Sequence, residues 1–481
     1  MKKVLFLAAA TAAIVSSCSQ SAESVIEDNS NNIETSQTPV NMSVYTASST
    51  RAGNTGNITD AQSLAEKGGF GVFAYQTKSK DYTAGQTEFQ PDFMYNQQVT
   101  GTDATAPVWS YTPIKFWPND NTVADNTTNN AKGVNNTGKV SFFAYAPYTT
   151  VTGKETSGIT GFSANSVAGD PTVSYKLAAN AKDNVDLLWG TAGTNNGSTT
   201  NGTAQNGTQL TGGKAKVNVD LTKMKNSGKV QFNFIHALAK LGGSGSDASS
   251  SNPAGLLIKA DPDDASYDRF GTETKITVKS IVLTTDGTNT DASGTTNQQS
   301  IVTSGKLDLA TGVWTLDQAA ATTLSQTIAQ STTSDKDAEL AKAIQEPERV
   351  ADGVSGFDAV PKGVTKDLQS VYKTETAPLL FIPGTYLPNL KVTITYVVRT
   401  KDPNLKKGYS ETTNVITKIV DFGGKKVEMN KRYTLTLILG VNSVKFDATV
   451  SDWTNTTATG TDSSDTPTVD NTDVNLPVNV E

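Results

Sequence analysis

Phe70-Gly71-Val72-Phe73-Ala74-Tyr75 is the stretch that first decides the fold of this chain, and Val140-Ser141-Phe142-Phe143-Ala144-Tyr145 repeats its pattern. Side chains in both stretches alternate between two faces, which is the period-two pattern of a β-strand. The same pattern returns, after runs of turn residues, at 217–221, 230–234, 256–259, 275–283, 379–382, 392–398, 415–420, 433–439 and 444–450. Strands that follow one another in this way favour β-sandwiches over βαβ units. We therefore predict an all-β protein.

Composition points the same way and limits the function. The chain has 481 residues, with 40 Lys and Arg against 47 Asp and Glu, and a formal net charge of -7 at pH 7. Because proteins bind nucleic acids by neutralising phosphates with Lys and Arg, this charge argues against a nucleic-acid partner. Thr, Asn, Ser and Gly are abundant, which favours strands and turns. The one helical expectation is Thr323–Glu346, with Ala338–Ile344 as its best part.

The N-terminus carries an export signal. Lys2 and Lys3 form a basic region, and Val4–Val15 is an apolar run too short to span a bilayer. Val15-Ser16-Ser17-Cys18 then matches a lipobox, in which a signal peptidase cuts before a cysteine that is diacylated. We predict a lipoprotein signal peptide at residues 1–18 and a mature protein held on a membrane by acyl chains. The alternative is an ordinary secretory signal with a chance cysteine.

Cys18 is also the only cysteine of the chain, so no disulfide framework is available. Polar residues 19–37 follow it, which is typical of a flexible tether. A short strand comes next, with alternating apolar residues at Val40, Met42 and Val44. Beyond it, Arg51 lies in a loop of small polar residues, where a protease with an acidic specificity pocket would cut.

The chain ends in a further alternating segment behind a Thr/Ser/Asp/Gly linker. Its apolar residues are Val474, Leu476, Val478 and Val480. A strand on a flexible linker either folds back onto its own chain or adds to the sheet of a neighbour, because an unpaired strand leaves its backbone groups without partners. Pro477 interrupts the pattern, since proline cannot donate to a ladder.

Several motifs together resemble the fimbrillin-like family of Bacteroidales, the subunits of type V pili. In chain order they are the lipobox at Cys18, Phe70–Tyr75, Lys115–Pro118, Phe142–Tyr148, Asp186–Gly190, Phe234–Leu241 and Val450–Trp453. The resemblance implies two transthyretin-like β-sandwich domains with Greek-key topology. Carried over to this chain, it implies a tether with a removable strand at 19–51, an N-terminal domain at 52–225, a C-terminal domain at 226–453, and a linker with a donor strand at 454–481.

The resemblance also implies how the protein matures. An Arg-specific surface protease would cut between Arg51 and Ala52, and the opened domain would accept the C-terminal strand of another subunit. The removed strand would hold Val40, Met42 and Val44, and the incoming strand Val474, Leu476, Val478 and Val480. The implied partners are other pilin subunits, in a homopolymer or with tip and anchor subunits, the protease, and the outer membrane before maturation. The mature protein would lie in an extracellular fimbrium that supports adhesion and biofilm formation, with no cofactor and no metal.

Other conspicuous residues are expected to be structural. His236 is the only histidine, and with one acylated cysteine it forms neither a catalytic triad nor a two-histidine zinc site; its apolar neighbours favour a core or capping role. The turn Asp261–Asp264 lacks the Gly and Glu of an EF-hand and is expected to be a solvated loop. Core packing is also the expectation for the tryptophans, among which Trp117 and Trp189 flank long polar loops and are the better candidates for contacting a ligand.

Two other functions stay open. One is an anchored surface lipoprotein that binds a glycan or a host protein without polymerising, which would need neither Arg51 nor the C-terminal strand. The other is a surface glycan-degrading enzyme, because any two carboxylates can meet in space, although no pair stands out in the sequence. The presence of both assembly features favours a structural pilus subunit that is not an enzyme.

Overall fold

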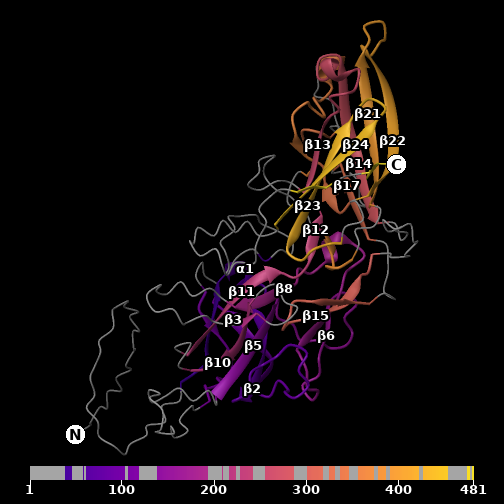
Figure 1. Ribbon diagram of the computed structural model, residues 1–481. Coiled ribbons are helices and arrows are strands. Elements are labelled where there is room, and N and C mark those ends of the chain that lie inside the picture. Colours follow the sequence, from indigo (N-terminus) through magenta and orange to yellow (C-terminus); the bar gives the residue numbers. More distant parts are fainter. Residues whose placement is uncertain are drawn as a thin grey trace, which may run out of the picture. The chain divides into compact units, whose positions relative to one another are not determined.

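The computed structural model describes residues 38–45, 58, 61–102, 107–118, 138–192, 208–209, 216–223, 228–241, 255–285, 301–317, 324–330, 336–345, 356–372, 378–385, 390–421, 426–452, 474–476 and 479–480. These residues belong to the unit formed by residues 37–481. Within these ranges strands predominate (Figure 1). The helical elements are α1 (Ala61–Glu66) and the 3₁₀ helices η2 (Ala181–Asp183), η3 (Tyr267–Arg269) and η4 (Phe357–Ala359). The all-β prediction is confirmed, whereas the number of sandwich domains and their Greek-key topology stay predictions.

The first sheet contains nine strands among the described residues. Seven follow the order β1-β11-β8-β5-β2-β3-β4, and β10 and β9 join through β5. The strands are β1 (Asn41–Tyr45), β2 (Phe70–Lys78), β3 (Met94–Gly101), β4 (Trp109–Ser110), β5 (Lys139–Ala146), β8 (Leu188–Ala192), β9 (Thr208–Gln209), β10 (Lys216–Leu221) and β11 (Lys229–His236). Neighbours in this sheet are antiparallel, except that β1 runs parallel to β11. In this order β1 is an end strand.

The two stretches that predict the fold form β2 and β5, which pair with each other in the first sheet. Every residue of β5 is buried, because each face of the sheet packs against its own hydrophobic cluster. Phe142 lies in the smaller cluster, whereas Phe143 and Tyr145, one position out of phase, lie in the larger one. Val40 and Met42 also belong to the smaller cluster. The core on this face of the sheet therefore includes the segment that carries β1.

A second sheet joins strands that lie far apart in the sequence. In the described ranges it comprises β6 (Gly158–Phe162), β7 (Thr172–Lys176), β15 (Ser304–Asp308) and β16 (Trp314–Leu316), in the order β16-β15-β7-β6. β15 comes from the range predicted for the second domain but pairs antiparallel with β7. β11 likewise begins at Lys229, beyond the predicted boundary after residue 225, and pairs with β8. The boundary stays a prediction, and these two pairings are among the contacts that cross it.

The remaining described strands form two further sheets. One has the order β19-β13-β23-β12-β20, with β24 on β23 and β25 on β24, and the other has the order β18-β17-β14-β21-β22-β26. The first contains β12 (Ala239–Leu241), β13 (Leu256–Ala260), β19 (Gln369–Ser370), β20 (Leu379–Phe381), β23 (Lys431–Leu439), β24 (Val444–Asp452) and β25 (Val474–Leu476). The second contains β14 (Thr274–Thr285), β17 (Ser325–Ala329), β18 (Ala338–Glu339), β21 (Leu390–Lys401), β22 (Tyr409–Asp421) and β26 (Asn479–Val480). Buried side chains of both sheets belong to the larger hydrophobic cluster.

The helical prediction for Thr323–Glu346 is wrong in the described part of that range. Its residues form β17, which pairs antiparallel with β14, and β18, which pairs parallel with β17. Ala338 and Leu340, two positions apart, are both buried. Pairing with a distant strand therefore prevails over helix-forming composition, which is a weak preference of a fraction of a kcal/mol per residue, about 0.7 at most for ordinary residues.

Candidate functional site

The segment that carries β1 lies along β11 and buries one of its faces. Its five strand residues pair in parallel, from Asn41 opposite Lys229 to Tyr45 opposite Asn233. Val40 and Met42 are 2% and 7% exposed, whereas Asn41 between them is exposed. Val44 is half-buried and packs against the same cluster. The alternation read from the sequence therefore corresponds to an inward and an outward face.

Residues 115–117 hold the other backbone edge of this segment. The amide of Val40 donates to the Lys115 carbonyl at 2.9 Å, and the amide of Trp117 donates to the Thr38 carbonyl at 2.9 Å. On the β11 side, the amide of Asn41 donates to the Gly228 carbonyl at 3.0 Å. We call the position between β11 and residues 115–117, which residues 38–42 fill, the β1 slot. A strand in the β1 slot has backbone partners on both edges.

The inner side of the β1 slot is lined by aromatic residues. Phe232 and Phe234 of β11 are 0% and 6% exposed, and their rings lie 5.6 and 5.2 Å from the ring of Phe70. Trp117 packs against Phe142 with ring centroids 5.7 Å apart. All five side chains share the hydrophobic cluster of Val40 and Met42. Withdrawal of residues 38–42 would remove apolar cover from this cluster.

The C-terminal segment pairs with strands of its own chain. In β25, Val474 lies opposite Val450 of β24 and Leu476 lies opposite Ala448. In β26, Val480 lies opposite Val420 of β22. Both pairings are antiparallel. Of the four apolar residues predicted to form a donor strand, three therefore lie in strands, and Val478 is outside the described residues.

The predicted processing residues also lie outside the described residues. These are Cys18, the lipidation site, and Arg51 and Ala52, which flank the expected cut. Lipidation and cleavage therefore stay predictions. Downstream of the expected cut, Ile58 is described and is 4% exposed, within the same cluster as Val40 and Met42.

His236 is buried and contacts a carboxylate at the end of β11. Its Nδ1 lies 3.1 Å from Oδ1 and 2.9 Å from Oδ2 of Asp186, and both side chains are almost fully buried. Asp186 also accepts the backbone N–H of Ile58 at 3.3 Å. This arrangement links the segment before α1 to the strands of the first sheet. It agrees with the core role expected for His236.

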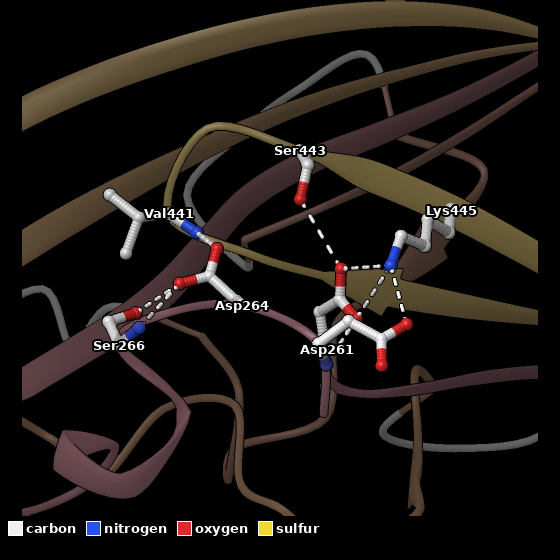
Figure 2. A network of polar contacts seen from close by, with 7 residues as sticks. Asp261, Asp264, Ser266, Val441, Ser443 and Lys445 are labelled. Atoms are coloured by element: carbon white, nitrogen blue, oxygen red, sulfur yellow. Dashed lines mark hydrogen bonds and ion pairs between the residues drawn. The ribbon is translucent and has the colours of Figure 1, made fainter.

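The turn at Asp261–Asp264 belongs to a polar network, which Figure 2 shows. Asp261 is 2% exposed, and Lys445 Nζ lies 3.1 and 3.0 Å from its two carboxylate oxygens. The amide of Val441 donates to Asp264 at 2.8 Å. The network ties this turn to the β23–β24 connection, up to 184 positions away in the sequence. The expectation of a solvated loop is therefore wrong for Asp261, because a distant lysine supplies its donor.

The two tryptophans singled out as ligand contacts are core residues. Trp117 and Trp189 are 5% and 2% exposed. The indole N–H of Trp189 donates to the carbonyl of Leu309 at 2.9 Å, next to β15. Neither ring offers a face to a ligand, since their surroundings are apolar side chains of the two clusters.

Within the described ranges, no helix is both long and apolar enough to cross a membrane. The acidic, histidine and cysteine side chains of these ranges also form no group of three that would hold a metal ion.

Known proteins resemble this chain in part of its sequence and in its fold. No protein-family model matches the chain. Over 254 residues the chain is 29% identical to a curated protein, the fimbrium subunit Fim1C of Phocaeicola vulgatus, in an alignment that covers 52% of this chain and 50% of that protein. The resemblance to fimbrial subunits of Bacteroidales is confirmed.

A solved structure shares the fold. The crystal structure of a fimbrial protein from Bacteroides vulgatus matches with a TM-score of 0.52 and 22% sequence identity, covering 86% of this chain and 99% of that one. At this identity the match concerns the fold alone. The chain spans about half the length of the curated fimbrium subunit that it matches.

Proposed function

We propose that this protein is a structural subunit of a cell-surface pilus, exported as a lipoprotein and polymerised by strand exchange. A cut between Arg51 and Ala52 releases the segment with Val40, Met42 and Val44. The vacated β1 slot then accepts the C-terminal strand of another copy. The similarity to a named fimbrium subunit over half of the chain supports the pilus assignment.

The observation that carries the proposal is the way β1 is held. The segment is tied to β11 on one backbone edge and to residues 115–117 on the other, and Val40 and Met42 enter the core. It lies upstream of Arg51 in the sequence, so a cut there separates it from the rest of the chain. When this segment dissociates, it leaves unpaired backbone groups on both edges of the slot and an uncovered apolar core, which another strand can fill.

The physics of that vacancy favours a replacement strand. Loss of β1 exposes aromatic side chains and unpaired backbone groups along β11, which is an aggregation-prone edge unless it is refilled. A replacement that buries aliphatic side chains gains about 1.5–3 kcal/mol for each one, and each ladder hydrogen bond adds about 0.5–1.5 kcal/mol. Head-to-tail contacts of this kind that do not close into a ring produce filaments.

The C-terminal segment is the candidate replacement. Val474, Leu476, Val478 and Val480 alternate with other residues and follow a linker that begins at residue 454. Assembly requires this segment to leave its present partners, β24 and β22. Those contacts comprise three and two residue pairs, which is a short ladder to break. No catalytic role is part of the proposal, since the relatives are named as fimbrial proteins.

The first test is the N-terminal sequence and intact mass of the protein sheared from native cells. A species that begins at Ala52 and runs as a high-mass ladder is expected. Arg51→Gln should keep the N-terminus and run as a monomer. A chain that stops after Asp473 should be cut normally but also stay monomeric. A wild-type species acylated at Cys18 and running as a monomer would contradict the proposal.

One observation favours a second candidate, an anchored surface lipoprotein that binds a glycan or a host protein without polymerising. The C-terminal strands already pair with β24 and β22 of their own chain, so they do not need a partner molecule. The burial of Trp117 and Trp189 removes the two tryptophans that sequence reasoning preferred for such a ligand. The acylated monomer described above is the outcome that this candidate requires.

A further inference from the structure

The C-terminal segment repeats the sequence that fills the β1 slot. Residues 39–42 are Pro-Val-Asn-Met, and residues 477–480 are Pro-Val-Asn-Val. Three of the four positions are identical, and the fourth exchanges one apolar side chain for another. In the first copy of this sequence, the valine and the methionine are the buried residues and the asparagine faces outward.

The proline of this repeat suits the backbone geometry of the slot. Pro39 is bridged to Phe116, and the hydrogen bonds on either side of the bridge are donated by Val40 and Trp117. Residue 39 therefore donates no hydrogen bond to residues 115–117, and its lack of an N–H costs nothing on that edge. Pro477, which interrupts the C-terminal strand pattern, can therefore take the position of Pro39.

We propose that residues 477–480 of a second copy occupy the β1 slot in the register of residues 39–42, parallel to β11. This inference rests on the proposed function and specifies its donor register. Val478 takes the place of Val40, and Val480 that of Met42. Asn479 faces solvent as Asn41 does, and its N–H donates to the Gly228 carbonyl.

The neighbouring registers are less favourable. A shift by one residue turns Val478 and Val480 outward, because successive side chains of a strand point to opposite faces. A shift by two places Leu476 and Val478 in the two buried positions, but it sets Pro477 where Asn41 stands. The Asn41 N–H donates to Gly228 at 3.0 Å, and a proline there removes that donor from a buried carbonyl.

The slot offers residues 477–480 backbone partners on both edges. In its own chain, β26 pairs two residues with β22. In the slot, Asn479 and Val480 would pair with β11 as Asn41 and Met42 do, and the amide of Val478 would donate to the Lys115 carbonyl on the other edge, as that of Val40 does. Because the described C-terminal strands of this chain lie on β24 and β22, we assign the slot to the tail of a second copy.

Engineered disulfides test the register directly. Asn41 pairs with Lys229, and both are exposed, so the proposal predicts a cross-link between Asn479→Cys and Lys229→Cys of two subunits. Paired residues on adjacent strands lie close enough for a disulfide, which spans about 4.4–6.8 Å between Cα atoms. The matched control pairs Asn479→Cys with Gln231→Cys, the partner of Ser43, which the register shifted by two would cross-link.

The full-length variants are treated with an arginine-specific protease, oxidised and run on a non-reducing gel. Each single-cysteine variant is the control for the native Cys18. The expected result for the Lys229 pair is a boiling-resistant ladder, which reductant collapses to monomer. The Gln231 pair should give at least tenfold less cross-linked ladder. A ladder only for the Gln231 pair, or for neither, in chains that still polymerise would overturn the register alone. A cross-linked monomer would overturn the second copy as occupant, and failure of the wild-type chain to polymerise would overturn the proposed function itself.

Discussion

Truncation of Met42 should loosen the whole segment in the β1 slot. Met42 is 7% exposed within the cluster that includes Phe232. Replacement of a buried Met by Ala costs about 2–5 kcal/mol, and the lower end applies here because β1 is an end strand. A loss of about 2 kcal/mol in local opening free energy corresponds to about 30-fold, since about 1.4 kcal/mol is tenfold in an equilibrium constant.

Amide hydrogen exchange is the assay that isolates this opening. The amides of Val40, Asn41 and Trp117 donate across the two edges of the slot, so each is released when the segment dissociates. In Met42→Ala, exchange in peptides that cover residues 38–45 and 115–118 should quicken about 30-fold, with peptides of β14 and β21 unchanged.

Asn41→Ala is the matched control, because this side chain is exposed. Exchange at residues 115–118 should stay within about twofold of the wild-type rate, since surface substitutions usually change stability by less than about 0.5 kcal/mol. Equal acceleration by both variants, or no acceleration in Met42→Ala, would refute the idea that inward side chains hold the segment in place.

Two further changes test contacts that cross between distant parts of the sequence. Burial and the nearby Asp170 raise the pKa of Asp308 from 3.8 to about 6. Ionisation of Asp308 therefore costs more in the folded than in the unfolded protein. The stability that the protonated carboxyl contributes is complete below about pH 4 and is lost as pH rises through 6. The unfolding free energy of Asp308→Asn should therefore match that of wild type near pH 4. At pH 7.5 it should exceed the wild-type value by up to about 3 kcal/mol in denaturant titrations, at about 1.4 kcal/mol per pKa unit. Equal stability of the two proteins at both pH values would contradict this. Gly312 has φ +70°, and an added Cβ would lie 2.3 Å from the Trp189 ring, whereas Gly271 has φ +84° and open space. Thermal unfolding should show a loss at least about 2 kcal/mol larger for Gly312→Ala than for Gly271→Ala, and similar losses would show that the ring moves aside.

Local sequence patterns predicted the strands well. The alternation at 70–75, 140–145 and 230–234 corresponds to β2, β5 and β11. This succeeds because the period of two is a property of the extended backbone itself. The prediction for Ala338–Ile344 failed because Ala338 and Glu339 pair with β17 and Leu340 is bridged to Tyr372, which no local pattern encodes.

The candidate site was predictable only in part. Alternation identified Val40 and Met42 as inward-facing residues, which their burial matches. The parallel pairing with β11 and the hydrogen bonds to residues 115–117 were not predictable, because they join segments about 75 to 190 positions apart. Cleavage at Arg51 stays a prediction.

By itself, the sequence determined the all-β class and the positions of most strands. The export signal stays a prediction, because residues 1–18 lie outside the described residues. Only the tertiary structure decided which strands are neighbours, that β15 pairs with β7, and that Asp261 is buried against Lys445. The physical reason is that strand periodicity is a property of consecutive residues, whereas burial and ladder hydrogen bonds depend on groups brought together from distant parts of the chain.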